Sequence, residues 1–277
     1  MYVAPAGTIL AVSAIELPPT HWYDYVAQVE YQHWSGMLKC GSDEKEFEHV
    51  KHVVELRLAQ KVGERFCTVF TWPGSFSLKE YLRGMSIQKK NDVLPVIFAQ
   101  VLSALQYLQR VALVHDNINL ENIMIRRGPT NVIEIVITDL DLVWSSYKSE
   151  DTELFWDVDL RTHIKERECK RGYRPPEEYG KKHTISQSKR SSWMVGATLY
   201  AAMTGIPPYG YTSSASGIIT WPDNATKQSA FSPVSTMYSS PLRKVLDLLL
   251  TPDTFYRPSA RFETASGKSI DQQQITH

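Results

Sequence analysis

Apolar residues recur at helical spacing along much of the second half of the chain. Between residues 91 and 110, one face of the predicted helix carries Leu94, Ile97, Val101, Leu105 and Leu108. Residues spaced by three and four positions share one side of an α-helix, so this segment is expected to bury that side in the core. Pro95 falls in the first turn of this predicted helix, where its missing N–H costs little. Residues 192–204 and 241–250 are also predicted to be helical.

The first half of the chain mixes strand-type and helix-type patterns. Residues 1–40 are rich in Val, Tyr, Trp and Ile, which favours short strands and turns. Residues 43–62 are predicted to form an amphipathic helix with Ser42 as its N-cap, because apolar residues recur there as Phe47, Val50, Val54 and Leu58. Residues 66–70 form a short apolar run that predicts a strand, and Pro73-Gly74 ends it.

The middle of the chain alternates short apolar runs with polar loops. A polar stretch from residue 115 to residue 122 is followed by Ile123-Met124-Ile125 and then by an apolar run over residues 132–137. These runs predict two short strands that flank polar loops. Residues 142–176 are charged and irregular, and loops of that length are usually functional or disordered.

The composition is that of a folded protein with no overall charge. Of 277 residues, 43% are hydrophobic and 22% are charged, and 30 basic side chains balance 30 acidic ones. A neutral chain has no overall field to attract nucleic acid or an anionic membrane surface. Apolar runs such as Met194 to Thr204 are shorter than the roughly 20 apolar residues that cross a bilayer. We therefore expect a protein that binds no nucleic acid and spans no membrane.

Cysteine usage favours a reducing compartment. The chain has three cysteines, with no CxxC pair and no nearby pair of histidines. The lack of these pairs argues against a metal site, and the odd number argues against a disulfide framework, so a cytoplasmic location is expected. Residues 1–15 are uncharged and lack the basic start of a secretory signal, so we expect them to form a strand region, with a signal remnant as the alternative.

The order of the polar motifs resembles that of the protein kinase fold. Residues 113–125 align without a gap on the kinase catalytic loop, whose usual form is H-R-D-L-K-x-x-N. Seventeen positions after Asn122, the segment Asp139-Leu140-Asp141 stands at the end of a predicted strand, where a kinase has D-F-G. Residues 172–177 resemble the end of an activation segment, and residues 193–209 resemble the long helix that follows it.

The resemblance also implies a fold and a set of structural residues. In kinases an arginine of the late D-x-x-x-R-P element pairs with the glutamate after a double proline, and here that pair is Glu177 and Arg257. His115 is the third expected structural residue. The implied fold is the bilobal α+β kinase-like fold, with a small strand-rich lobe over residues 1–72. A hinge at residues 73–75 and a larger helical lobe over residues 76–277 complete it.

The expected catalytic positions do not carry the usual catalytic residues. Asn117 stands at the position of the catalytic carboxylate, and an amide has no useful basicity at neutral pH. Asn119 stands at the position of the catalytic-loop lysine, which removes a cation from the developing negative charge. Asp116 is a candidate substitute base, but it lies one position early in the loop; the alternative is a solvent-facing or turn-capping aspartate.

Residues suited to hold Mg²⁺ are retained. Asn122 and Asp139 match the metal ligands of the family, and the alternative for both is loop hydrogen bonding. Asp141 replaces the glycine of D-F-G, which adds a third possible oxygen ligand and removes easy access to positive φ.

The expected nucleotide-binding elements of the small lobe are weak. Residues 34–40 resemble the third kinase strand, which makes Lys39 the candidate phosphate lysine, with Glu55 as its expected partner and Glu48 as the alternative. The alternative for Lys39 is a solvated strand-edge residue. No glycine lies between Gly7 and Gly36, so no glycine-rich loop is present there to bring backbone N–H groups to phosphates.

The resemblance and these losses together predict a pseudokinase that acts by binding another protein, such as an active kinase or the substrate of one. ATP and Mg²⁺ are the cofactors to test. The alternatives are an unconventional active Ser/Thr kinase that binds ATP with Mg²⁺, and a nucleotide-gated scaffold. Within the kinases, the segment from Gly172 to Glu177, together with Asp-Leu-Asp and Trp193-x-x-Gly196, is similar to the rhoptry kinases and pseudokinases of apicomplexan parasites. That branch implies secretion, as an alternative to the cytoplasm, for a chain that begins inside a longer protein.

Overall fold

The computed structural model describes residues 10–16, 52–54, 56–62, 65–71, 76–110, 113–115, 117–127, 132–139, 143–145, 172–179, 187–209, 212–213, 219–220 and 231–258. Several sequence-predicted features lie outside these residues: Lys39, Ser42, Glu48, Glu55, the hinge at residues 73–75, Asp116 and Asp141.

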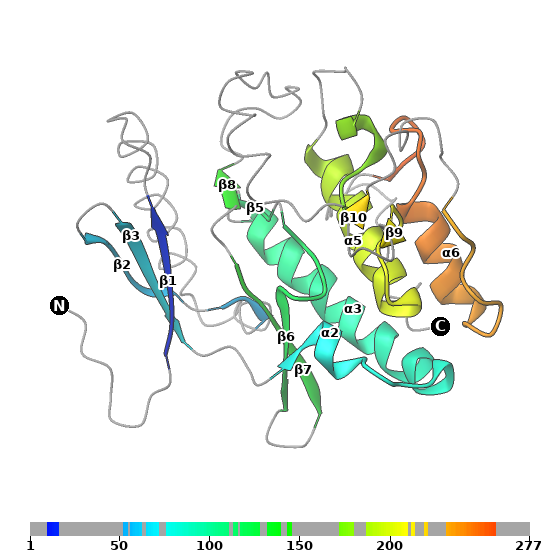
Figure 1. Cartoon of the computed structure of the whole chain (residues 1–277), viewed down its shortest axis with the longest axis horizontal. Coiled ribbons are helices and arrows are strands. Elements are labelled where there is room, and N and C mark those ends of the chain that lie inside the picture. The colour runs from blue at the N-terminus through cyan, green and yellow to red at the C-terminus, as the bar shows by residue number, and fades with distance from the viewer. Residues whose placement is uncertain are drawn as a thin grey trace.

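A three-stranded antiparallel sheet is formed by residues from the first quarter of the chain (Figure 1). Its strands are β1 (Leu10–Glu16), β2 (Leu56–Val62) and β3 (Arg65–Thr71), in the order β1-β3-β2. Strand β3 lies in the centre and pairs with β1 along its whole length. The strands contain β-branched and aromatic residues, which favour a β-sheet, such as Val12, Val69 and Phe70. The predicted strand at residues 66–70 is confirmed, and β1 falls in the region where short strands were expected.

The helix predicted over residues 43–62 is wrong at residues 53–54 and from residue 56 onward. Residues 56–62 form strand β2, which pairs with β3 from Leu56 to Val62. Val53 forms a parallel β-bridge with Ile137 immediately before it. The misassignment has a physical cause. Val54 and Leu58 are four residues apart and fit a helix, but with Leu56 between them they also fit the alternation of a strand. Pairing with β3 decides between the two patterns.

Helix α3 (Ile87–Arg110) is the longest described element, and it carries the predicted apolar face into the core. It begins four residues earlier than expected, because Ser86 accepts a hydrogen bond from the backbone N–H of Lys89 and caps it. Pro95 therefore lies inside the helix and not in its first turn. An interior proline costs about 3 kcal/mol. Burial of neighbouring side chains offsets that cost; they include Leu94, Ile97, Phe98 and Val101.

A second sheet packs against α3. Its strands are β4 (Phe76–Ser77), β6 (Ile123–Arg127) and β7 (Ile133–Ile137), in the order β4-β6-β7. The short helix α2 (Leu78–Tyr81) follows β4 directly and begins with a capping box between Ser77 and Glu80. A separate antiparallel pair joins β5 (Leu113–His115) to β8 (Val143–Ser145), so the predicted irregular segment from residue 142 opens with a strand.

The segment before β2 is attached to this second sheet. The backbone N–H of Val54 donates to the carbonyl of Ile137 at 2.9 Å. The Nδ1 atom of His52 lies 3.1 Å from the carbonyl oxygen of Ile135, which can only accept, so Nδ1 is the donor. Both contacts reach strand β7 just before the chain arrives at Asp139.

The remaining helices form the other side of the core (Figure 1). They are the 3₁₀ helix η3 (Pro176–Tyr179), helix α5 (Gln187–Thr204) and helix α6 (Ser240–Leu249). A small hairpin joins β9 (Thr212–Ser213) to β10 (Ile219–Thr220). Helix α5 is almost entirely buried from Ser192 to Met203 and packs on α6. The predicted helices at residues 192–204 and 241–250 are confirmed.

The described elements combine helices with small antiparallel sheets, so the predicted α+β class is confirmed. Within the described ranges, the structure contains no helix that is both long enough and apolar enough to cross a membrane.

Candidate functional site

The polar loop after β5 is held against the end of strand β7. The carbonyl oxygen of Asn122 accepts hydrogen bonds from the backbone N–H of Thr138 at 2.9 Å and from its hydroxyl at 3.2 Å. The backbone N–H of Asn122 in turn bonds to the carbonyl of Asn119 at 3.2 Å. These contacts fix the loop beside the residue that follows Thr138, which is Asp139.

The carboxylate of Asp139 accepts hydrogen bonds from two amide side chains. The Nδ2 atoms of Asn117 and Asn122 each lie 2.7 Å from the same oxygen, Oδ2 of Asp139. Hydrogen bonds to a charged acceptor are short and about twice as strong as neutral ones. Asp139 has φ of 61°, in the left-handed region that Asp tolerates better than most residues. The structure therefore brings together Asn117, Asn122 and Asp139, as the sequence alignment expected.

Asn119, at the expected lysine position, turns its side chain back into the loop. Its Nδ2 atom donates to the carbonyl oxygen of Asn117 at 2.9 Å and to Oδ1 of Asn117 at 3.1 Å. Its own Oδ1 accepts from the backbone N–H of Glu121 at 2.9 Å. The side chains of Asn117 and Asn119 are both buried, with exposed fractions of 8% and 2%. Asn119 thus stabilises the loop and does not extend toward solvent or a ligand.

His115 is fixed in one neutral tautomer by its two hydrogen bonds. Its Nε2 lies 2.9 Å from the carbonyl oxygen of Thr138 and must donate, since a carbonyl only accepts. Its Nδ1 accepts from the backbone N–H of Asn117 at 3.2 Å. Complete burial lowers the pKa of His115, although the bond to Thr138 and the charge of Asp139 oppose that shift. His115 therefore links the loop to β7 as an uncharged ring.

Helix α5 is attached to the loop by a buried hydrogen bond. The hydroxyl hydrogen of Thr198 is shared between the carbonyl oxygens of Met194, at 2.7 Å, and Ile118, at 3.1 Å. Thr198 is fully buried, so this bond reaches the loop through the protein interior. Ser191, at the position where kinases usually have a clamping aspartate, is also on α5.

The structure also brings together Glu177 and Arg257. Both terminal nitrogens of Arg257 donate to the two carboxylate oxygens of Glu177, and the guanidinium carbon lies 4.8 Å from the ring centre of Trp193. This cluster lies between η3, α5 and the segment after α6. Its contacts are structural.

The sequence analysis did not identify two residues of the site. Thr138 and Thr198 are separated from the loop in sequence and carry no charge, and each acts through one hydroxyl that reaches a loop carbonyl. The position of Thr138 directly before Asp139, at a strand end, was the one available signal for it. Nothing in the sequence around Thr198 distinguishes it from other residues of a buried helix.

The side chains of Asn122 and Asp139 are hydrogen-bonded to each other, which is the arrangement that the sequence analysis gave as the alternative to a Mg²⁺ site. Mg²⁺ prefers oxygen ligands, but Asn122 presents its nitrogen to Asp139, and Oδ2 of Asp139 already accepts two amide hydrogens. Among the residues that the structure describes, no group of three or more His, Cys, Asp and Glu side chains could hold a metal ion. Metal binding by Asn122 and Asp139 stays a prediction.

The three-stranded sheet has two outer strands, and one of them, β2, contains Arg57 and Lys61. Strand β1, which pairs with β3, has the sequence LAVSAIE and contains neither lysine nor arginine.

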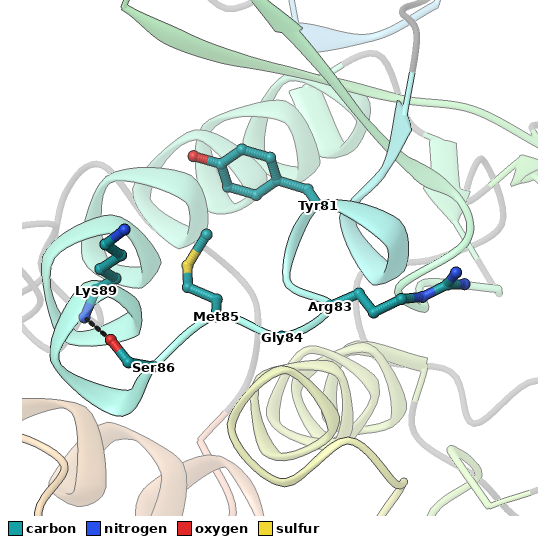
Figure 2. Close-up of a pocket in the computed structure, with 6 residues that line it drawn as sticks. All are labelled: Tyr81, Arg83, Gly84, Met85, Ser86 and Lys89. Carbon is teal, nitrogen blue, oxygen red and sulfur yellow. Dashed lines mark hydrogen bonds between the residues drawn. The ribbon is translucent and has the colours of Figure 1, made fainter.

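A pocket of about 350 Å³ lies away from this loop, at the turn between α2 and α3. Tyr81, Arg83, Gly84, Met85, Ser86 and Lys89 line it. Figure 2 shows Lys89 and Arg83 at opposite ends of this group, with the Arg83 side chain directed away from Lys89. The two cations therefore do not converge on one ligand atom. The pocket is separate from the cluster around Asp139.

Comparisons with known proteins place the chain in a family. The family model described as "protein kinase domain" matches residues 44–266, which is most of the chain. Over 120 residues the chain is 30% identical to the serine/threonine-protein kinase ppk27 of Schizosaccharomyces pombe. That match covers 41% of this chain and 27% of the relative, so it spans about a quarter of the yeast protein. Because the family match extends over most of the chain and the fold is α+β, this chain belongs to the protein kinase family.

Proposed function

We propose that this chain is a pseudokinase, a kinase-fold protein that does not transfer phosphate and acts by binding another protein. One observation carries the proposal. At the position of the catalytic base, Asn117 has an amide that donates to Asp139 at 2.7 Å. An amide has no useful basicity at neutral pH, and Oδ1 of Asn117 already accepts a hydrogen bond from Asn119 at 3.1 Å, so Asn117 cannot take the proton of a substrate hydroxyl.

The loss of the base is large enough to matter. General-base catalysis contributes roughly 10²–10⁴-fold to a rate, which corresponds to about 3–5 kcal/mol of barrier. Asn119 adds to this loss, because it replaces a cation at the transferring phosphate and is buried in hydrogen bonds within its own loop. The two changes act in the same direction.

The structural contacts around the loop are kept although the catalytic residues are not. The fold is stabilised by contacts that no catalytic step requires. They are the pair of Glu177 and Arg257, the neutral ring of His115 and the hydroxyl of Thr198. The proposed partner is a protein, and an active kinase or the substrate of one fits the shared fold. The likeness to the rhoptry branch, and with it the choice between cytoplasm and secretion, stays a prediction.

The test is phosphoryl transfer by the purified chain with Mg²⁺-ATP and a generic protein substrate. Protein kinase domains as a class bind ATP with Mg²⁺, so an active Ser/Thr kinase serves as the positive control. We expect the wild-type chain to match an Asp139→Ala variant at the level of the enzyme-free blank. Turnover that Asp139→Ala abolishes would overturn the proposal.

A second candidate function is an unconventional active Ser/Thr kinase, and the yeast relative favours it because its name states that activity. In that case Asp116, or water, takes the role of base. An Asp116→Ala variant separates the candidates, because only an active kinase that uses Asp116 as its base would lose phosphoryl-transfer activity when this residue is replaced.

A nucleotide-gated scaffold is distinguished by binding. A ligand at 100 times its Kd stabilises a folded protein by about 2.7 kcal/mol. A Mg²⁺-dependent rise in Tm with millimolar ATP favours the gated scaffold, and no rise favours a scaffold that works without nucleotide.

A further inference from the structure

The hydrogen bonds around Asp139 form one consistent donor and acceptor chain. Asn122 uses one amide hydrogen for the carbonyl of Asn117 at 2.8 Å and the other for Oδ2 of Asp139 at 2.7 Å. Asn117 donates to the same Oδ2, and its Oδ1 accepts from Asn119. Because the carboxylate can only accept, the nitrogens of Asn117 and Asn122 must both face it.

This arrangement supplies what a divalent cation supplies in a carboxylate site. A cation would lie beside the carboxylate oxygens and stabilise their negative charge. Here two N–H groups, at 2.7 Å each, point at Oδ2 of Asp139 instead. An ionised carboxylate that lacks both a cation and hydrogen bonds is costly in a half-buried setting. With the amides in place, Asp139 needs no metal to remain folded in its left-handed conformation.

Building on the proposed loss of phosphoryl transfer, we infer that the side-chain amide of Asn117 takes the place of a divalent cation at Asp139. The substitution that removes the base therefore also closes the metal site. A carboxylate at position 117 would put two like charges where an amide now bonds a carboxylate, and only a cation or a proton would stabilise them. The site of the wild-type chain is self-neutralised and independent of Mg²⁺.

The test exchanges the amide at position 117 and the carboxylate at position 139. Tm is measured in EDTA and in millimolar MgCl₂, without nucleotide, for the wild-type chain, Asn117→Asp, Asp139→Asn and the double variant Asn117→Asp/Asp139→Asn. The double variant keeps one amide and one carboxylate at the same two positions, so it is the matched control for the single changes. Asn119→Asp serves as a control for added negative charge that is not aimed at Oδ2.

The expected results are specific. The wild-type Tm is the same in EDTA and in MgCl₂. Asn117→Asp lowers the Tm by roughly 3–6 °C in EDTA and regains most of that loss in MgCl₂ or MnCl₂. The double variant recovers a wild-type-like Tm in EDTA, whereas Asn119→Asp gains nothing from the cation.

Binding gives a second readout that does not depend on Tm. Titration of Mn²⁺ followed by electron paramagnetic resonance should show one bound ion per chain for Asn117→Asp and none for the wild type. If Asn117→Asp does not fold in EDTA, a folded double variant still supports the inference. A double variant that also fails to fold contradicts it, as does a wild-type chain that MgCl₂ stabilises or an Asn117→Asp variant indifferent to the ion.

The two proposals fail separately. If the wild-type chain transfers phosphate and its Tm is the same with and without Mg²⁺, the proposed function is wrong. The inference about Asn117 then still holds. A wild-type chain that MgCl₂ stabilises without any transfer would remove only the inference about Asn117.

Discussion

Arg257 bonds Glu177 through both of its terminal nitrogens, at 2.6 Å and 2.9 Å, across 80 positions of sequence. The side chain of Arg257 is fully buried and that of Glu177 is 10% exposed. The guanidinium also bonds the carbonyls of Thr251, Pro252 and Lys189. The bidentate geometry and the extra bonds satisfy a charge that would otherwise be costly to bury.

Replacing Arg257 is expected to destabilise the fold strongly. Arg257→Lys keeps the charge but loses the planar fork, so Glu177 and several carbonyls are left without partners. We expect a loss of about 3–5 kcal/mol in the free energy of unfolding, measured by urea denaturation. The exposed pair of Lys79 and Glu121, at 57% and 42% exposure, is the matched control, and its Glu121→Ala variant should lose at most about 1 kcal/mol. Equal effects at the two pairs would contradict this account of Arg257.

Gly196 is expected to tolerate no side chain. A Cβ at this position would lie 2.7 Å from Cβ of Leu249, because α5 and α6 approach closely there. Gly196→Ala should cost about 1–3 kcal/mol of stability, measured by thermal or urea unfolding. The double variant Gly196→Ala/Leu249→Gly removes the facing Cβ and should lose less than the sum of its single changes. Strict additivity would show that the helices do not meet at Gly196.

The titration of His115 makes stability depend on pH. Burial lowers the pKa of His115 in the folded chain, whereas the unfolded chain takes up a proton near its ordinary pKa of about 6.5. The unfolded state therefore binds more protons in the window just below pH 6.5. In that window the free energy of unfolding falls as the pH falls, and it levels off below the folded pKa. Unfolding curves from pH 8 to pH 5 measure this.

The control for His115 is His115→Gln, which keeps a donor and an acceptor but does not titrate. Its stability should vary less with pH over the same window than that of the wild-type chain. Identical pH profiles for the two proteins would assign the dependence to other groups.

The hydroxyl of Thr198 is expected to hold the loop from α5. Thr198→Val leaves the buried carbonyl of Ile118 without its partner, which should cost about 1–3 kcal/mol. Thr251 bonds helix carbonyls in the same way but in an exposed setting, so Thr251→Val should change stability by at most about 0.5 kcal/mol. Amide hydrogen exchange should increase in the loop at residues 117–122 only for Thr198→Val, and an unchanged loop would contradict this role.

Much of the fold follows from the spacing of apolar residues. The apolar face of α3, the helices at residues 192–204 and 241–250 and the strand at residues 66–70 were all predicted from their apolar residues. The strand at residues 56–62 was not, because Val54, Leu56 and Leu58 fit both periods and only pairing with β3 selects one. The start of α3 was missed because Ser86 caps the helix, and an N-cap bond depends on local geometry.

The sequence predicted which residues form the candidate site, but not how their side chains bond to one another. The spacing of Asn117, Asn122 and Asp139 placed three side chains together. It did not show that both amides face one oxygen of Asp139, or that Asn119 folds back on Asn117. Those outcomes depend on side-chain rotation within a crowded loop, which sequence spacing does not constrain.

The central claim is that an amide at position 117 leaves this kinase fold without phosphoryl transfer. The most direct test is the single-turnover rate of γ-phosphate transfer from ATP, compared between the wild-type chain and Asp139→Ala at equal concentration with saturating Mg²⁺. The account predicts equal rates, both at the enzyme-free blank. A wild-type rate above that blank, lost on Asp139→Ala, would contradict it.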